Sequence, residues 1–382
     1  MNKQQEPRLR FKGFTGTWEE KKVIDFSPLQ RGFDLPVSKI TEGDYPVVFS
    51  NGILKSHNQY KVKGVGIVTG RSGTIGEVTF VEKDFWPHNT ALWVTNFFGN
   101  NPQFVFHFLK NFDLSRFATG SGVPTLNRND VHNQTIYVPK FEEQTYLGNF
   151  FRRLDSQIAE SRAVLEKSRQ LKKAMLAKMF PANGEKIPKI RFKGFEGEWE
   201  CRKLGDVVEI VGGYAFKSAE FGSGNMAIIR ISNILPNGSI GGDFVYFGED
   251  ENLEKFKANK NDYLIAMSGA TTGKIGQVRH EAYINQRVGL FRQNENSNND
   301  FIGSLLQKEE FLTYLMENWG AGAQPNISIK QMENYNTYFP NLKEQTAIGN
   351  FFRQLDETIA LQSAEVEKLN QLKKGLLAAM LV

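Results

Sequence analysis

Two stretches of the chain place apolar residues at alternating spacings of four and three, the pattern of a helix that buries one seam. In residues 141–180 seven of ten seam positions are apolar, and in residues 342–381 eight of ten. At 1.5 Å per residue, each stretch predicts a helix about 60 Å long. The seam residues that we expect to pack these helices are Leu147, Phe151, Leu154, Ile158, Leu165, Ile348, Phe352, Leu355, Ile359 and Val366.

A helix with such a seam needs a mate, and two interpretations of these helices are open. Polar residues such as Lys172 and Lys373 interrupt both seams. The helices are either structural spacers, or they pair with each other and also offer faces to another protein. The adjacent pairs Phe150–Phe151 and Phe351–Phe352 cannot lie wholly in one narrow seam, which favours more than a two-helix contact.

Both helical stretches are copies of one sequence, and so are the segments that begin each half of the chain. Residues 141–180 and 342–381 share 22 of 40 positions, and residues 7–22 and 188–203, the signature segments, share 10 of 16. The repeating unit of about 190 residues is domain-sized, which excludes a solenoid of short repeats. The chain is therefore expected to be a pseudo-dimer in one polypeptide, with two modules related by an approximate two-fold.

Between the copies lie two dissimilar stretches, residues 23–140 and 204–341, in which β-rich runs alternate with glycine-rich turns. Each also carries a helical pattern near its end, over residues 101–112 and 300–319. This mixture is typical of α+β domains. The predicted parts are a first variable domain (1–140), a central helix (141–181), a second variable domain (182–341) and a C-terminal helix (342–382).

The two variable stretches share a skeleton but differ in their loop residues. "IVTGRSGTIGEV" (67–78) and "IAMSGATTGKIGQV" (265–278) both predict a strand, a glycine loop and a strand, and Pro124 matches Pro325. Similar scaffolds with different loops predict two related sites that read different ligands.

Several loop side chains are of the types that recognise base edges. Arg and Lys suit guanine, whereas Asn and Gln suit adenine. Each can equally be a solvated turn residue that bonds its own backbone. The candidates are Arg71, Ser72, Asn89, Lys274, Asn285, Gln286 and Arg287.

Charge and cysteine content limit the class of protein. The net charge is +5, with +2 in residues 23–140 and −5 in residues 204–341, which is modest for a protein that grips nucleic acid alone. A DNA-binding role would need local positive charge or a partner that supplies it. One cysteine, no signal-peptide pattern and no membrane-length apolar run predict a cytoplasmic protein without disulfides that does not span a membrane.

No motif in the chain predicts catalysis. "SGATTGKI" (268–275) resembles a phosphate-binding loop, but Ser268 stands where that motif needs glycine and Ile275 where it needs Ser or Thr. The five histidines lack metal-ligand spacing, and there is no Gly-x-Ser-x-Gly elbow and no S-adenosylmethionine loop. We therefore expect no catalytic residue, metal site or cofactor in this chain.

Two variable domains, each followed by a helix of the form "EQ…GNFFRxLDxxI…LKK", resemble the specificity subunit of a type I restriction–modification system. The segments that carry the resemblance are Glu143–Gln144, Leu154–Asp155, Ile158, Leu171–Lys173, Glu344–Gln345, Leu355–Asp356, Ile359 and Leu372–Lys374.

Parts of the second variable domain also resemble the target-recognition domains of that family. These are the loop from Ser268 to Lys274 and the Asn285–Gln286 pair, which adds Ser268 to the candidate DNA contacts. The first domain departs from this pattern, with Thr74 and Thr90 where Lys274 and Gln286 stand.

The resemblance implies an α+β fold, with two target-recognition domains joined by two long antiparallel coiled-coil helices. Each domain would read one half of a bipartite double-stranded DNA target in the major groove, and the helices would set the gap. Two modification subunits would bring S-adenosylmethionine and adenine-N6 methylation, and restriction subunits would bring ATP and Mg. The chain itself would have no catalytic activity.

Two other classes of function stay open at this point. A DNA-independent scaffold that binds protein or carbohydrate would explain the repeats and the acidic second domain. It would not explain why the scaffolds match while the loops diverge. A methyltransferase ranks third, because its cofactor and catalytic motifs are missing.

Overall fold

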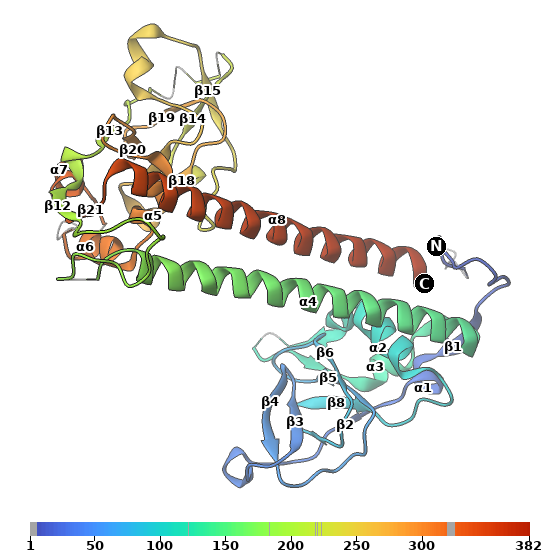
Figure 1. Cartoon of the computed structure of the whole chain (residues 1–382). Helices are drawn as coiled ribbons and strands as arrows, with labels where there is room; N and C mark the ends of the chain where they lie inside the picture. The colour runs from blue at the N-terminus through green and yellow to red at the C-terminus, as the bar shows by residue number, and fades with distance from the viewer. Residues whose placement is uncertain are drawn as a thin grey trace. The chain divides into compact units, whose positions relative to one another are not determined.

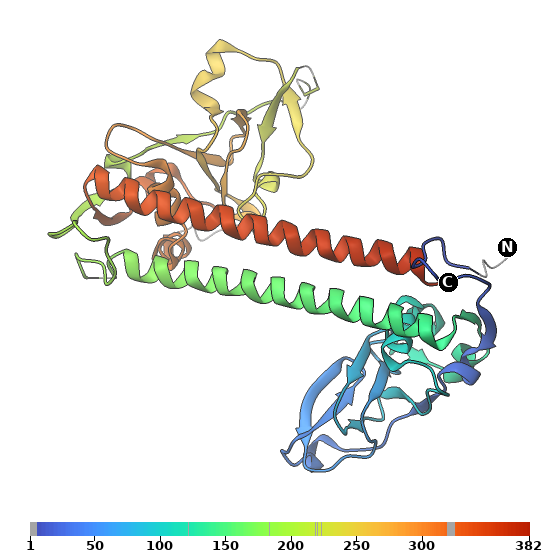
Figure 2. The same cartoon turned by 45° about the vertical axis from the view of Figure 1, so that its right-hand side comes forward.

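The computed structural model describes residues 6–120, 122–182, 184–217, 219, 221–222, 224–318 and 325–382. It divides into two compact units, Met1–Ala163 with Ser363–Val382, and Val164–Gln362. Two long helices, α4 (Phe141–Met179) and α8 (Leu342–Met380), are each continuous over 39 residues and are shared between the units (Figures 1 and 2). Within the described ranges, no helix is both long and apolar enough for a membrane span.

The first unit is built on small twisted sheets covered by short helices (Figure 1). One sheet has the order β2-β8-β5-β6 and another the order β4-β3-β7, in which β3 and β7 are parallel. Helix α2 packs on β5 and β6. The elements are β1 (Glu19–Lys22), α1 (Val23–Phe26), β2 (Leu29–Arg31), β3 (Tyr45–Phe49), β4 (Gly52–His57), β5 (Gly66–Gly70), β6 (Val78–Val81), β7 (Trp86–Pro87), β8 (Ala91–Val94), α2 (Pro102–Asn111), β9 (Ala118–Thr119), β10 (Thr125–Leu126), α3 (Arg128–His132) and β11 (Thr135–Val138).

The second unit repeats this plan. Its sheets have the orders β13-β20-β17-β18 and β15-β14-β19-β16, and β14 is parallel to β19 as β3 is to β7. The elements are β12 (Glu200–Lys203), β13 (Glu209–Gly212), β14 (Met226–Ile229), β15 (Val245–Phe247), β16 (Lys257–Ala258), β17 (Tyr263–Ala266), β18 (Ile275–Gln277), β19 (Ala282–Ile284), β20 (Val288–Arg292), α5 (Asn299–Leu306), α6 (Glu309–Asn318), α7 (Ile329–Glu333) and β21 (Asn336–Phe339).

The helix expected over residues 300–319 is two helices, α5 and α6, separated by Gln307 and Lys308. The Gln307 side chain donates to the carbonyl of Gly303 (2.9 Å), which satisfies a group at the end of α5. Lys308 is 6% exposed and donates to the carbonyl of Pro181 (3.3 Å). This tertiary contact ends the helix at a point that the apolar pattern does not mark, and Trp319 lies outside the described residues.

The glutamine of each Glu-Gln pair ties a long helix to its own domain. Gln144 accepts a hydrogen bond from the backbone N–H of Asn101 (2.9 Å) and donates to Asn100 Oδ1 (2.8 Å). Gln345 accepts from the N–H of Asn298 (3.1 Å) in the same way. Asn101 and Asn298 are the N-caps of α2 and α5, so the glutamines hold the start of each domain helix against a long helix.

Gly148 and Gly349 allow the same close approach. A Cβ on Gly349 would lie 2.4 Å from Asn298 Oδ1 and 2.7 Å from the backbone N of Phe301. A Cβ on Gly148 would lie 2.8 Å from the backbone N of Phe104. These contacts are shorter than side-chain carbons allow, so the repeated glycine is a packing requirement.

The glutamate of each pair is buried and is neutralised by the signature segment. Arg10 donates two hydrogen bonds of 2.7 Å to Glu143, and Arg191 donates to Glu344 at 2.6 and 2.7 Å. The carboxylates of Glu143 and Glu344 are 3% and 0% exposed. A buried carboxylate needs a paired cation, which explains why the signature segment and the helix are repeated together.

The signature segments also bind the end of the opposite long helix. The N–H of Leu9 donates to the carbonyl of Ala379 (2.9 Å), and the N–H of Ile190 donates to the carbonyl of Lys178 (2.9 Å). These bonds satisfy carbonyls that a helix end leaves unpaired. Each signature segment thus joins the start of one long helix to the end of the other within its own unit.

Reciprocal ion pairs show that α4 and α8 are antiparallel within each unit. Lys373 pairs with Asp155 in the first unit, and Lys172 pairs with Asp356 in the second. The two lysines are equivalent positions of the repeat, and so are the two aspartates. Because equivalent residues of the repeat make the same contact in each unit, these pairs confirm the antiparallel helices and the internal repeat. They also explain the lysines that interrupt the seams.

The seam residues differ in how deeply they are buried. Those that are at most 6% exposed are Leu147, Phe151, Leu154, Ile158, Leu165, Ile348 and Phe352. Leu355, Ile359 and Val366 are half-buried.

His107 of α2 lies beside one of the reciprocal ion pairs. It is 1% exposed, its Nδ1 lies 3.8 Å from Asp155 Oδ2, and neither ring nitrogen has a hydrogen-bond partner among the described residues. Its ring contacts the rings of Phe106 and Phe151. Burial lowers the pKa of His107 to about 4, with Lys373 acting in the same direction and Asp155 against it.

We expect Gly349→Ala to destabilise the protein by about 1–3 kcal/mol, because its Cβ would overlap the N-cap of α5. Gly375→Ala in the same helix is the matched control, since no atom lies within 4 Å of its added Cβ. That control should gain up to about 1 kcal/mol from helix propensity. Urea unfolding followed by circular dichroism measures both, and equal effects would contradict the packing argument.

The pKa of His107 also predicts how stability depends on pH. The folded state holds the His107 ring neutral, so the unfolded state binds more protons as the pH falls. The contribution of His107 to the free energy of unfolding is therefore complete above pH 6.5 and is lost as the pH falls towards about 4. In His107→Phe, the difference from the native protein in urea midpoint should therefore change across this window. The exposed His280→Gln is the control and should track the native protein, and parallel profiles for His107→Phe would refute the assignment.

Candidate nucleic-acid interface

Backbone hydrogen bonds join three loops of the first unit. The N–H groups of Arg71 and Ser72 donate to the carbonyl of Thr90 (2.9 and 3.1 Å), and the N–H of Gly73 donates to the carbonyl of Pro124 (3.0 Å). The N–H of Leu126 in turn donates to the carbonyl of Arg71 (2.8 Å). The loops that follow β5, β7 and β9 therefore form one surface.

The second unit holds three loops by the same bonds. The N–H of Met267 donates to the carbonyl of Arg287 (2.9 Å), and the N–H of Gly269 donates to the carbonyl of Pro325 (3.1 Å). Ile327 returns to the carbonyl of Met267 (2.8 Å). The two units thus carry equivalent loop clusters on equivalent strands, which we call the recognition loops.

The strand register shows which loop residues are equivalent. Gly70 lies opposite Ala91, and Ala266 lies opposite Val288. This register places Ser72 at the position of Ser268.

Further along, the same register corrects two sequence matches. It makes Asn89 the equivalent of Gln286 and Thr90 the equivalent of Arg287, so Thr90 is not the residue that corresponds to Gln286. The N–H groups of Gly70 and Ala266 donate to the carbonyls of Glu77 and Lys274, so Glu77 rather than Thr74 is at the position of Lys274. Backbone pairing fixes these matches. A comparison of residue types alone misplaces them, because the two loops differ in length.

Glycine is required at one position of both clusters. Gly73 has φ +82° and Gly269 has φ +75°, in the left-handed region that disfavours side chains. Each follows the serine that the register makes equivalent, Ser72 or Ser268. After the turn, Gly73 and Thr74 of the first unit are exposed, whereas in the second unit Ala270 is exposed and residues 271–274 are half-buried.

The candidate base contacts differ in exposure. Gln286 and Arg287 are exposed, and neither side chain has a hydrogen-bond partner in the described part of the chain. Asn285 is half-buried and its N–H donates to the carbonyl of Ile229 (2.9 Å). Lys274 is also half-buried. Gln286 and Arg287 are therefore the candidates of the second unit that are best placed to meet a ligand.

In the first unit the candidates Arg71, Ser72 and Asn89 are all half-buried. The side chain of Asn89 donates to Asp34. Behind these residues, His88 contacts Thr90 Oγ1 through Nδ1 (2.9 Å) and the carbonyl of Leu35 through Nε2 (3.1 Å). Burial lowers the pKa of His88, so the ring is neutral near pH 7 and links two loops.

Comparison with known families decides the class of protein. Residues 15–167 and 196–371 match the family model of the type I restriction modification DNA specificity domain, once in each half of the chain. The chain belongs to this family of specificity subunits.

Known specificity subunits resemble the chain over most of its length. The type I restriction enzyme MjaVIII specificity subunit of Methanocaldococcus jannaschii is 27% identical over 286 residues, which cover 72% of this chain and 67% of that protein. The EcoAI specificity subunit of Escherichia coli is 29% identical over 212 residues, which cover 53% of this chain and 34% of that protein. A solved type I S subunit from M. genitalium aligns with a TM-score of 0.74 at 17% identity and covers 99% of both chains, which shows the same fold.

A fourth loop of this specificity subunit joins the cluster of the first unit, and the sequence patterns do not indicate it. The N–H of Ser50, in the tight turn after β3, donates to Thr90 Oγ1 (3.3 Å). In the second unit β14 ends at Ile229, and a longer loop follows. The amide of Asn233, 1% exposed, donates to the carbonyls of Gly241 (3.0 Å) and Asp243 (3.1 Å) and closes that loop.

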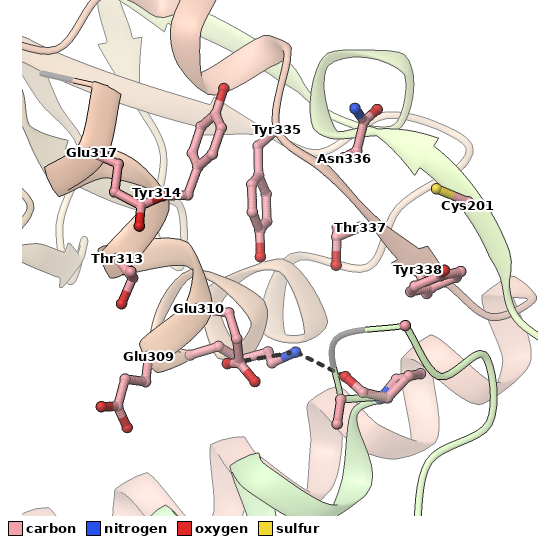
Figure 3. A pocket seen from close by; sticks show the side chains of 14 residues that line it. Cys201, Glu309, Glu310, Thr313, Tyr314, Glu317, Tyr335, Asn336, Thr337 and Tyr338 are labelled. Atoms are coloured by element: carbon pink, nitrogen blue, oxygen red, sulfur yellow. Dashed lines mark hydrogen bonds and ion pairs between the residues drawn. The ribbon is translucent and has the colours of Figure 1, made fainter.

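A cavity of about 680 Å³ in the second unit, shown in Figure 3, has none of the candidate base contacts in its lining. It is lined from α6 and β21 by Glu309, Glu310, Glu317 and several tyrosines. The ammonium group of Lys308, 3.8 Å from a carboxylate oxygen of Glu310, lies in its wall. In the described parts of the chain, no group of three or more His, Cys, Asp or Glu side chains is placed to hold a metal ion.

Proposed function

We propose that this specificity subunit reads a bipartite double-stranded DNA target, with one half-site bound by the recognition loops of each unit. The observation that carries the proposal is the equivalence of the two loop clusters. The same backbone bonds hold both, while the loop residues differ, as with Thr90 and its equivalent Arg287 or Glu77 and its equivalent Lys274. Two loop clusters with the same backbone structure but different side chains are suited to recognise two different base sequences in the major groove.

We propose that α4 and α8 set the gap between the half-sites. Both helices belong to both units, and their antiparallel pairing in each unit is tied by a signature segment. A 39-residue helix is about 58 Å long. A pseudo-two-fold protein that reads two half-sites in the same groove favours whole turns of DNA, about 34 Å each.

The exposed apolar residues of the helix pair support docking of two modification subunits. Phe141 and its repeat equivalent Leu342 are 56% and 45% exposed, and Leu171 and its equivalent Leu372 are 46% and 50% exposed. Duplicated exposed positions suit two copies of one partner. In this proposal those subunits carry S-adenosylmethionine and methylate adenine at N6, and restriction subunits add ATP- and Mg-dependent cleavage.

The subunit itself performs no chemistry in this proposal, and its affinity depends on its partners. The variable stretch 204–341 carries a net charge of −5, so the phosphate contacts that dominate DNA affinity must come largely from elsewhere. Base contacts by the recognition loops would then supply specificity.

Exchange of residues 23–140 for the matching stretch of another specificity subunit should change one half-site and leave the other half-site and the gap unchanged. The readout is methylome sequencing of a host that expresses the chain with its modification subunits. The isolated chain, incubated with DNA and S-adenosylmethionine, is the control and should transfer no methyl group. Changes in both half-sites, or turnover by the chain alone, would contradict the proposal.

Insertion of four residues into both long helices, after Ala163 and after Gln362, should widen the gap by one or two base pairs. Four residues add about 6 Å of helix, and one base-pair step is about 3.4 Å. The same methylome measurement shows the gap, while both half-sites should stay as they are. An unchanged gap in an active complex would exclude the helices as the spacer.

A further inference from the structure

Arg31 and Asp34 form a polar cluster with Asn89 at the edge of the recognition loops of the first unit. Nη2 of Arg31 donates to Asp34 Oδ1 (2.7 Å), and Nδ2 of Asn89 donates to the same oxygen. The side chains of Arg31 and Asp34 are 49% and 66% exposed. The hydrogen bond from Asn89 and the charge of Arg31 lower the pKa of Asp34, so the carboxylate stays ionised at neutral pH.

The backbone that carries Arg31 and Asp34 is fixed against the recognition loops. The N–H of Gly32 donates to the carbonyl of Ala91 (3.0 Å), and the N–H of Phe33 donates to the carbonyl of Pro87 (2.8 Å). A Cβ on Gly32 would lie 2.2 Å from the carbonyl oxygen of His88, so only glycine allows this contact. The backbone beside Arg31 and Asp34 is therefore held in a fixed position against the recognition loops.

The donors that this cluster leaves free are those that base recognition uses. Arg31 has five N–H groups and donates one of them to Asp34. The remaining N–H groups are sufficient for two hydrogen bonds to guanine O6 and N7. Asn89 spends one of its two N–H groups and keeps the other, with its carbonyl, for adenine N7 and N6. Two donors bound to one oxygen lie within about 5 Å of each other, which spans neighbouring base pairs.

We propose that Arg31 reads a guanine in the half-site bound by the first unit, with Asp34 as the positioning residue that orients its guanidinium group beside Asn89. The inference rests on the proposed function and extends it to one base. An exposed arginine held by a carboxylate loses less side-chain freedom on binding than a free one, which favours a defined contact.

The second unit lacks this cluster. The N–H of Gly213 donates to the carbonyl of Val288, which lies opposite Ala266 as Ala91 lies opposite Gly70, so Gly213 is the equivalent of Gly32. Gly212 and Ala215 then occupy the positions of Arg31 and Asp34. The recognition of guanine at this place is therefore specific to one half-site.

The test compares R31K, R31A, D34A, D34E and the control K186A with the native chain, each expressed with its modification subunits. Methylome sequencing first defines the native bipartite motif. Binding of each complex to duplexes with every base at each position of the first half-site then gives the base preferences. R31K keeps the positive charge for a phosphate contact but loses the two-bond contact to guanine.

We expect R31K and R31A to lose a preference for guanine of roughly 5- to 150-fold at one position, with the second half-site unchanged. D34A should weaken the same preference more mildly, and D34E should restore part of it. The exposed pair Lys186–Glu198, with side chains 54% and 62% exposed, supplies the control K186A, which should leave the motif unchanged.

Three results would overturn the inference while the proposed function stands. These are a first half-site without guanine, a motif that R31K and R31A leave intact, and an R31A complex that binds all duplexes equally less well with a smaller salt dependence, as for a phosphate contact. A native complex without any bipartite motif would instead refute the proposed function itself.

Discussion

The reciprocal pairing of Asp155 with Lys373 and of Asp356 with Lys172 is the constraint on which the rest of this structure depends. Each pair joins an aspartate of one long helix to a lysine of the other. The two aspartates occupy equivalent positions of the repeated sequence, and so do the two lysines. Charged residues within a seam cost stability but specify partner and register. The two helices can therefore pair antiparallel in one register, and that register is the same in both units.

The repeated Glu-Gln pair and the signature segment transmit this register to the domains. Gln144 and Gln345 fix the N-caps of the domain helices, and Arg10 and Arg191 neutralise the buried glutamates. The same segments close onto the end of the opposite helix. The residues shared by the two repeats thus hold the frame, whereas the loops between them differ from one unit to the other.

Much of this fold could be predicted from sequence, because apolar spacing and repetition are local and redundant signals. The long helices and the α+β repeat are confirmed. The break at Lys308 was missed because a contact with the carbonyl of Pro181 ends the helix there. The loop equivalences were misjudged because strand hydrogen bonds set them. Arg31 was overlooked because it ends a strand, and only tertiary packing at Gly32 brings it to Asn89.

The central claim is that the two helices stay paired while the protein reads DNA. Cysteines placed at Arg162 and Asn370, whose side chains are hydrogen-bonded between the two helices of the first unit (3.0 Å), allow a short bifunctional maleimide to lock the helices in a chain with Cys201→Ser, without removing either ion pair. Methylation by the assembled complex is then measured before and after the reaction. The account predicts efficient cross-linking and the same bipartite motif at an unchanged rate. Failure to cross-link, or loss of methylation once the helices are locked, would contradict it.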